Sequence, residues 1–200
     1  MKIRRITKGF TLIEVMVSVA IFAVVMVMAL GALLALSTAD RKAESLKAAI
    51  NNLNFALDAM SRSIRSGVNY HCDASALPIT ATRDCAAGAS SFSFLSASGI
   101  IGSGDSPYLN AQIVFCRGSG TTCDPAGTSL LFSSNGGAFA PITAPEVVIT
   151  KLLFYVVGST LGGGVQPKVN ITLSGYVQVS PTQQTPLYLQ SAIAQRLYNQ

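Results

Sequence analysis

Hydrophobic residues are concentrated near the start of the chain and are not spread evenly along it. Residues 10–36 form an apolar run of 27 residues in which Glu14 is the single ionisable side chain. As a helix that rises about 1.5 Å per residue, this run is longer than the ~30 Å hydrocarbon core of a bilayer. We therefore expect residues 10–36 to form a membrane-spanning helix, in which Gly31 is the one weak point and allows a bend.

The helix is predicted to continue to about residue 66, but with a different pattern. Charged side chains appear from Asp40 onward and make residues 37–66 wettable. Large apolar residues then recur at steps of four and three, which places them on one stripe of an amphipathic helix: Leu46, Ile50, Leu53, Leu57, Met60 and Ile64. Gly67 is the expected stop. This stripe requires a second structural layer against which it can pack.

Residues 67–200 change to short β-prone runs separated by Gly-rich turns. The runs are 91–96, 111–116, 129–133, 147–157, 168–179 and 187–194, and the turns are 102–105, 135–137 and 162–164. Such spacing favours an antiparallel sheet of about four to six strands. We expect an α+β fold in which one face of this sheet covers the 46–64 stripe and residues 67–200 form an exterior head.

The net charge of +5 has a local origin. Lys2, Arg4, Arg5 and Lys8 all precede the apolar run, and without residues 1–9 the balance is 10 basic against 9 acidic residues. Nucleic-acid binding is therefore not expected, because it requires a basic patch. Basic residues that flank a first helix stay in the cytoplasm. The sequence predicts a single-pass membrane protein whose N-terminus is cytoplasmic and whose head lies outside.

All four cysteines follow the apolar run, in the part expected to face an oxidising compartment, where disulfides are the default. Of three connectivities, the sequential pairing Cys72–Cys85 and Cys116–Cys123 is favoured because each pair is close in sequence. Zinc binding is the alternative, but the spacings do not match the short C-x-x-C pairs of structural zinc sites. No metal, cofactor or catalytic residue is predicted: His71 is the only histidine, and no G-x-S-x-G motif is present.

A small residue, Gly9, precedes the apolar run, and a carboxylate, Glu14, lies inside it. Gly9 gives an accessible peptide bond to Phe10, and Glu14 lies four residues further into the helix. A charge in lipid costs about 2.5–3.5 kcal/mol on insertion scales. Cleavage before Phe10 would create an α-ammonium group at a similar depth on a neighbouring subunit, and this amine would be a natural partner for Glu14.

The segment K-G-F-T-L-I-E-V-M-V-S, from Lys8 to Ser18, resembles the N-terminal motif of type IV prepilins and type II secretion pseudopilins. The resemblance covers about residues 4–35. It implies a leader at residues 1–9, cleavage between Gly9 and Phe10 by a prepilin peptidase, N-methylation of Phe10, and a role for Glu14 in assembly. The implied partners are other pilin or pseudopilin subunits and an inner-membrane assembly platform. Many pilins have a proline where Gly31 stands.

Residues 52–65, 148–156 and 167–173 resemble J-class minor pseudopilins and related W-class minor pilins. The resemblance implies a minor subunit of a type IV pilus or of a type II secretion pseudopilus. Three other readings stay open. Residues 10–36 could be an ordinary anchor or a secretory signal peptide cut after residues 37–39, although a signal core is usually 7–15 residues long. The head could belong to a disulfide-containing adhesin or binding module.

Overall fold

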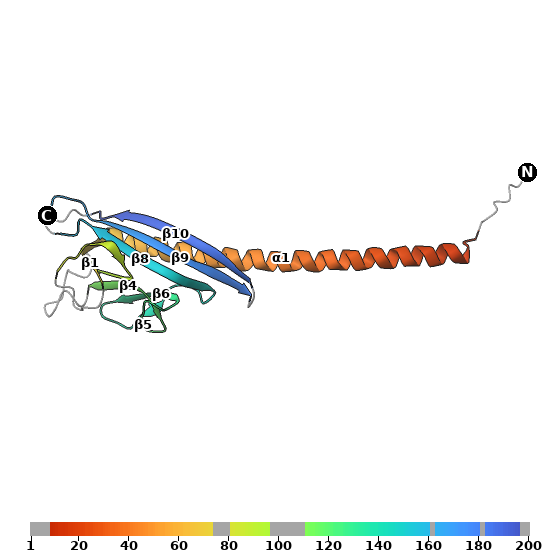
Figure 1. Ribbon diagram of the computed structural model, residues 1–200, viewed down its shortest axis with the longest axis horizontal. Helices are drawn as coiled ribbons and strands as arrows, with labels where there is room; N and C mark the ends of the chain where they lie inside the picture. Colours follow the sequence, from red (N-terminus) through yellow and green to blue (C-terminus); the bar gives the residue numbers. More distant parts are fainter. Residues whose placement is uncertain (1–8, 74–80, 97–110, 161–162, 181–182, 197–200) are drawn as a thin grey trace, which may run out of the picture. The chain divides into compact units, whose positions relative to one another are not determined.

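The structure is a computed structural model that describes residues 9–73, 81–96, 111–160, 163–180 and 183–196 (Figure 1). One long helix, α1 (Leu12–Ser66), precedes ten strands that all pair antiparallel, which confirms the expected α+β fold. The chain divides into two compact units, residues 1–44 and residues 45–200. Residues 1–8 of the expected leader and the expected turn at 102–105 lie outside the described residues.

The first unit contains the apolar part of α1. Every residue from Leu12 to Glu44 is exposed, including all of the large apolar side chains of the run. The helix is continuous through Gly31, where an added Cβ would meet no atom within 4 Å. Nothing in the chain itself covers this apolar surface among the residues described, so the surface requires a non-aqueous environment or other helices.

The second unit begins with the part of α1 that packs on the strands. Its buried residues are Ala49, Leu53, Ala56, Met60 and Ile64. The expected stripe is therefore partly wrong: Ile50 is 43% exposed, and Leu46 and Leu57 are only partly buried. The buried line is rotated toward two alanines, because their short side chains let the strand side chains approach the helix backbone closely.

The first sheet contains six strands in the order β1-β3-β4-β6-β7, with β5 paired to β4. Their bounds are β1 Gly67–Cys72, β3 Ser91–Ser96, β4 Gln112–Ser119, β5 Thr122–Cys123, β6 Ser129–Ser134 and β7 Ala140–Pro141. The turn after β6 is built on Asn135 and Gly136, which both have positive φ values, as a tight reversal favours.

The second sheet contains four strands in the order β10-β9-β8-β2. Their bounds are β2 Cys85–Ala89, β8 Val147–Val157, β9 Lys168–Ser180 and β10 Gln183–Ala194. The expectation of a single sheet is thus wrong, although each of the six predicted β-prone runs overlaps a strand, the run 111–116 beginning one residue before β4. The strands absent from the prediction are short or carry few β-prone residues, as the Ala- and Gly-rich β2 illustrates.

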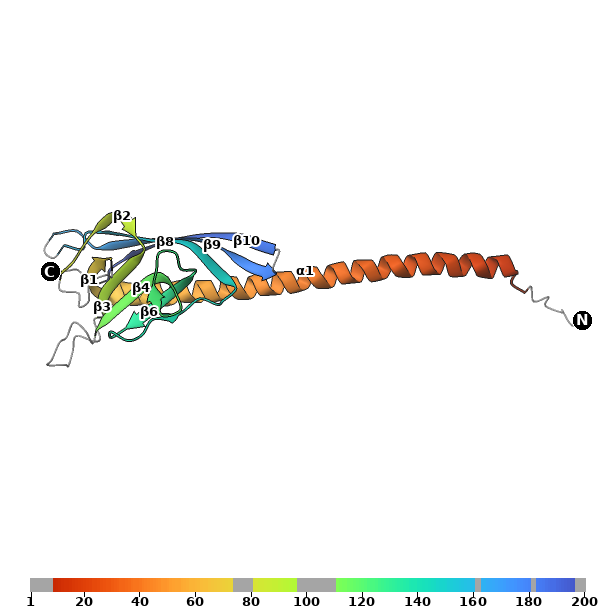
Figure 2. The ribbon, with the colours of Figure 1, turned by 60° about the horizontal axis from the view of Figure 1, so that its bottom comes forward.

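The two sheets meet along β8. The Ile149 N–H donates to the Thr128 carbonyl (2.8 Å), and the Arg117 guanidinium donates to the Thr150 carbonyl. Figure 2 shows β8 and β9 beside the shorter strands of the first sheet. The core between the strands and the second part of α1 is rich in aromatic rings, which contact one another edge to face or in stacks: Tyr70, Phe92, Phe94, Phe115, Phe132 and Phe154.

The end of α1 is tied to the head by hydrogen bonds to its last carbonyls, which have no partner within the helix. The Tyr70 hydroxyl donates to the Ile64 carbonyl (2.5 Å), and the Arg196 N–H donates to the Arg65 carbonyl (2.8 Å). The helix ends at Ser66, as the expected stop at Gly67 predicts. Close packing requires glycine at this position, because a Cβ at Gly67 would overlap the ring of Phe94.

Candidate functional site: the N-terminal junction

The Gly9–Phe10 peptide bond lies just outside α1. Gly9, Phe10 and Thr11 have no regular secondary structure, all three are exposed, and the helix begins at Leu12. A side chain built on Gly9 would meet no atom within 4 Å. An extended, accessible segment is what a protease requires, because a bond inside a helix cannot enter an active-site cleft without local unfolding.

Thr11 caps the helix, a role that the sequence reasoning missed. The Thr11 hydroxyl accepts a hydrogen bond from the Glu14 N–H (3.4 Å), and the Thr11 carbonyl accepts from the N–H groups of Glu14 (3.1 Å) and Val15 (3.3 Å). Thr-x-x-Glu is the capping-box pattern, so the sequence did contain the signal. The cap fixes where the helix starts and therefore leaves the Gly9–Phe10 bond outside it.

Glu14 stands in the first turn of α1 with its side chain exposed. A carboxylate at this position is favoured by the partial positive charge of the helix N-terminus. Within the described ranges its carboxylate has no hydrogen-bond or ion-pair partner. Its sequence neighbours Ile13 and Val15 are large, exposed apolar side chains.

The helix that follows the junction is long and apolar enough to cross a membrane, on length and composition. It is the one such helix found in the part of the chain that the structure describes. The window that meets this criterion is not buried within the chain at all, which distinguishes it from the core helix of a soluble domain. This length, composition and exposure fit a membrane anchor.

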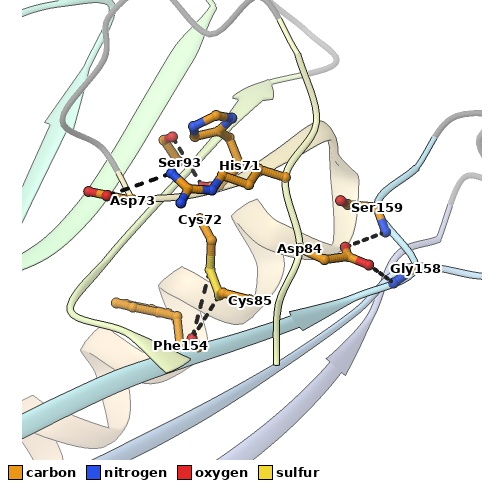
Figure 3. The surroundings of a disulfide bond; sticks show 10 residues. His71, Cys72, Asp73, Asp84, Cys85, Ser93, Phe154, Gly158 and Ser159 are labelled. Atoms are coloured by element: carbon orange, nitrogen blue, oxygen red, sulfur yellow. Dashed lines mark hydrogen bonds and ion pairs between the residues drawn. A yellow bond between two sulfur atoms is a disulfide. The ribbon is translucent and has the colours of Figure 1, made fainter. Parts of the chain in front are cut away.

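The cysteines lie far along the chain from this junction. The structure joins Cys72 on β1 to Cys85 on β2, and Cys116 on β4 to Cys123 on β5, with Cα–Cα distances of 5.9 and 5.7 Å. The first bond therefore links the two sheets, and the second closes a hairpin within one sheet. Both sulfur atoms of the first bond lie near the carbonyl oxygen of Phe154, in the core (Figure 3).

Asp84, beside the first disulfide, holds the loop after β8. Its carboxylate accepts hydrogen bonds from the N–H groups of Gly158 (3.0 Å) and Ser159 (2.8 Å) (Figure 3). Partial burial alone would raise the pKa of Asp84, but the bonds from Ser159 and Gly158 outweigh it and hold the pKa below its usual value. Asp84 is therefore a structural anchor for this loop.

The structure offers no metal centre among the residues it describes, since no group of three or more His, Cys, Asp or Glu side chains gathers there. His71 hydrogen-bonds through Nδ1 to the Ala81 carbonyl (2.8 Å), and its neighbour Cys72 is engaged in a disulfide. His71 and the cysteines, which the sequence offered as zinc ligands, therefore have other partners.

Comparison with protein families finds one match. Residues 4–30 match the model described as the prokaryotic N-terminal methylation motif, which begins in the leader and covers Gly9, Phe10, Thr11 and Glu14. Neither curated proteins nor solved structures give a match to this chain. The matched family is structural and not catalytic, which is consistent with a protein that is not an enzyme. The chain thus carries the N-terminal methylation signature of type IV prepilins and pseudopilins, and this motif supports a pilin-like precursor.

Proposed function

We propose that this protein is a minor pilin or pseudopilin subunit that a prepilin peptidase matures and that assembles through α1 into a type IV pilus or a type II secretion pseudopilus. The methylation motif at residues 4–30 carries the proposal. The exposed, non-helical Gly9–Phe10 bond supports it, because a peptidase can reach this bond without unfolding the helix. The assignment as a minor subunit rests on the resemblance of residues 52–65, 148–156 and 167–173 to that class.

Maturation in this proposal has two steps. Hydrolysis of the Gly9–Phe10 bond consumes one water and leaves a carboxylate on Gly9 and an amine on Phe10. An activated methyl donor then transfers one methyl group to that amine, which loses a proton. The basic leader residues keep this end in the cytoplasm. The head, with its two disulfides, lies outside, where oxidising conditions favour them.

Assembly in this proposal uses the exposed apolar surface of residues 10–36. Moving this surface from lipid to contact with other apolar helices changes its hydration little, so extraction into a filament is feasible. Glu14 has no partner within the described chain, and the new amine of a neighbouring Phe10 supplies one. The pair sets the axial register of adjacent subunits through their first turns.

Mass spectrometry of the mature N-terminus tests the maturation step. The expected product begins at Phe10 and is one methyl group heavier than the unmodified chain. Replacement of Gly9 by Val is the matched variant, since a side chain at this position meets no atom of the chain and leaves the fold alone. We expect Gly9→Val to accumulate as the uncut precursor. Mature protein that starts at Met1 or Asp40 would contradict the proposal and favour an anchored or secreted binding module.

Glu14→Gln tests the assembly step separately. Glutamine keeps the capping-box pattern with Thr11, so the start of the helix is retained while the charge is lost. We expect normal cleavage at Phe10 but loss of the subunit from sheared filaments or from crosslinked assemblies. Thr11→Val is the control for capping without a change in charge. Incorporation of Glu14→Gln at the wild-type level would remove the role proposed for the carboxylate.

A further inference from the structure

Strands β8, β9 and β10 lie side by side (Figure 1), and their pairing aligns the outward residues into rows that run across the three strands. The register places Tyr155, Asn170 and Ala192 in one row, then Leu153, Thr172 and Gln190, then Lys151, Ser174 and Tyr188. Residues between these positions, such as Ile171 and Leu173, are buried on the opposite face. The strand pairing therefore sets which side chains share the outward face.

Polar and aromatic side chains predominate on this face, with Leu153 and Ala192 among them. Its outward side chains include three tyrosines, several amides and hydroxyls, and two lysines: Tyr155, Tyr176, Tyr188, Asn170, Thr172, Ser174, Gln178, Gln190, Lys151 and Lys168. Tyr188 is 79% exposed, so its ring offers an open apolar plane. Surfaces rich in Tyr, Ser and Asn are typical of recognition, because they combine flat apolar contact with adaptable hydrogen bonding.

Two hollows open on this face, and each has one lysine at its edge. The larger, about 510 Å³, is lined by Lys151, Tyr155, Thr172, Tyr188 and Gln190 among others. The smaller, about 270 Å³, is lined by Lys168, Asn170 and residues 192–194. The larger hollow thus has two tyrosine rings, hydroxyl and amide groups and one ammonium group around a single space.

The two lysines have no acidic partner within the described residues. No outward position in these rows carries a carboxylate. Elsewhere in the described head, Asp58 pairs with Arg62, Asp73 with Arg83, and Asp84 and Asp124 accept backbone N–H groups. Glu146 lies just before β8, beside Gln178 and at the opposite end of β9 from Lys168. The face is therefore complementary to an anionic partner.

We propose that this face binds a polysaccharide that carries carboxylate groups. Hydroxyl and amide side chains both donate and accept hydrogen bonds, which matches the many hydroxyl groups of a sugar. Tyrosine rings provide flat apolar contact for the C–H faces of sugar rings. The two ammonium groups, one at each hollow, match carboxylates that are spaced along a chain and not packed on every unit.

A single-stranded nucleic acid fits this face less well. It carries a phosphate at every nucleotide, and its binding sites are positively charged grooves that track the backbone. Two separated lysines, one at each hollow, do not form such a groove. The inference goes beyond filament assembly, because it concerns a surface on residues 148–194 and not the helix that carries the maturation site.

The test uses the full mature chain in mild detergent, with hyaluronate, which carries a carboxylate on every second sugar, as the probe and neutral dextran as the matched polymer. We expect binding to hyaluronate that weakens as salt rises, and much weaker binding to dextran. Lys151→Glu and Lys168→Glu are each expected to weaken binding by about threefold to tenfold. Tyr188→Ala is expected to weaken it by about fivefold. Lys47→Glu, an exposed change on α1, is the control and should bind as the wild type does.

Three results would overturn the inference. They are equal affinity for dextran and hyaluronate, unchanged affinity for hyaluronate after both lysine reversals, or stronger binding to single-stranded DNA than to hyaluronate. Circular dichroism of each variant confirms that the head is folded. Binding by the head and maturation of the N-terminus are measured separately. A failure of polysaccharide binding therefore leaves the test of maturation by mass spectrometry unaffected.

Discussion

The part of α1 up to Glu44 buries none of its side chains within the chain, whereas the part from Ser45 to Ser66 buries one side against the strands. Both parts belong to one uninterrupted helix. Propensity does not explain the difference, because β-branched residues are frequent in the first part and would weaken a helix in water. The first part is suited to lipid or to other apolar helices, where a helix satisfies its own backbone. The second part is stabilised by its own head.

Replacement of Leu53 by Ala tests this contrast with the largest expected effect. Leu53 is 1% exposed and lies in the core, so its truncation leaves a cavity and is expected to cost about 2–5 kcal/mol of unfolding free energy. Leu33→Ala, at a side chain 63% exposed, should change the stability of the head by less than about 0.5 kcal/mol. Urea unfolding of the full chain in mild detergent, followed by circular dichroism, measures both. Equal losses would contradict the division of α1.

A charge placed in each part tests the environment of the exposed surface. Val24→Lys is expected to disfavour membrane insertion by about 2.5–3.5 kcal/mol, because Val24 lies near the middle of the apolar run. Phe55→Lys, at a side chain 75% exposed in the second part, should leave insertion unchanged. Protease protection of the head in membrane vesicles reports insertion. Wild-type insertion of Val24→Lys would show that residues 10–36 do not span the bilayer.

Tyr70→Phe tests the link between the helix end and the head, and its expected effect is the smallest. Loss of the hydrogen bond to the Ile64 carbonyl is expected to cost about 1 kcal/mol of unfolding free energy. Burial raises the pKa of Tyr70 above its usual value. The folded state therefore resists ionisation, and its stability should fall as pH rises above about 10, where the unfolded chain ionises.

Unfolding by urea at about pH 8 and about pH 11 measures this pH dependence. Tyr70→Phe should lose less stability between the two pH values than the wild type does. Tyr188→Phe, at an exposed ring, is the matched control and should follow the wild type. A parallel fall for Tyr70→Phe and the wild type would contradict the assignment of the alkaline loss to Tyr70.

Much of the local structure follows from local patterns. The six β-prone runs overlap β3, β4, β6, β8, β9 and β10, and the bounds of β3 and β8 agree residue by residue with the predicted runs. The short strands were not predictable. β1 follows the helix without a turn signal, and β2 is composed of small residues. They form strands because β1 pairs with β3 and β2 pairs with β8, which is a tertiary effect.

The candidate site shows the same division. Gly9, Phe10 and Glu14 could be proposed from the sequence because their pattern is local: a small residue before an apolar run, and a carboxylate within that run. The helix cap at Thr11 could also have been predicted, because Thr-x-x-Glu is the capping-box pattern. The outward rows of β8, β9 and β10 were not predictable, because they depend on which residues become opposite partners when strands far apart in sequence pair.

The sequence by itself determined the apolar helix, its continuation to Ser66, the N-terminal methylation motif and the positions of the β-prone runs, because each depends on residues near one another in the chain. Only the tertiary structure decided that the strands form two sheets, that Cys72–Cys85 joins them, and that Ala49 and Ala56 take the place of Ile50 in the buried line of α1. These outcomes depend on how closely distant segments can pack, and the volumes of side chains that meet only in the folded chain set that distance.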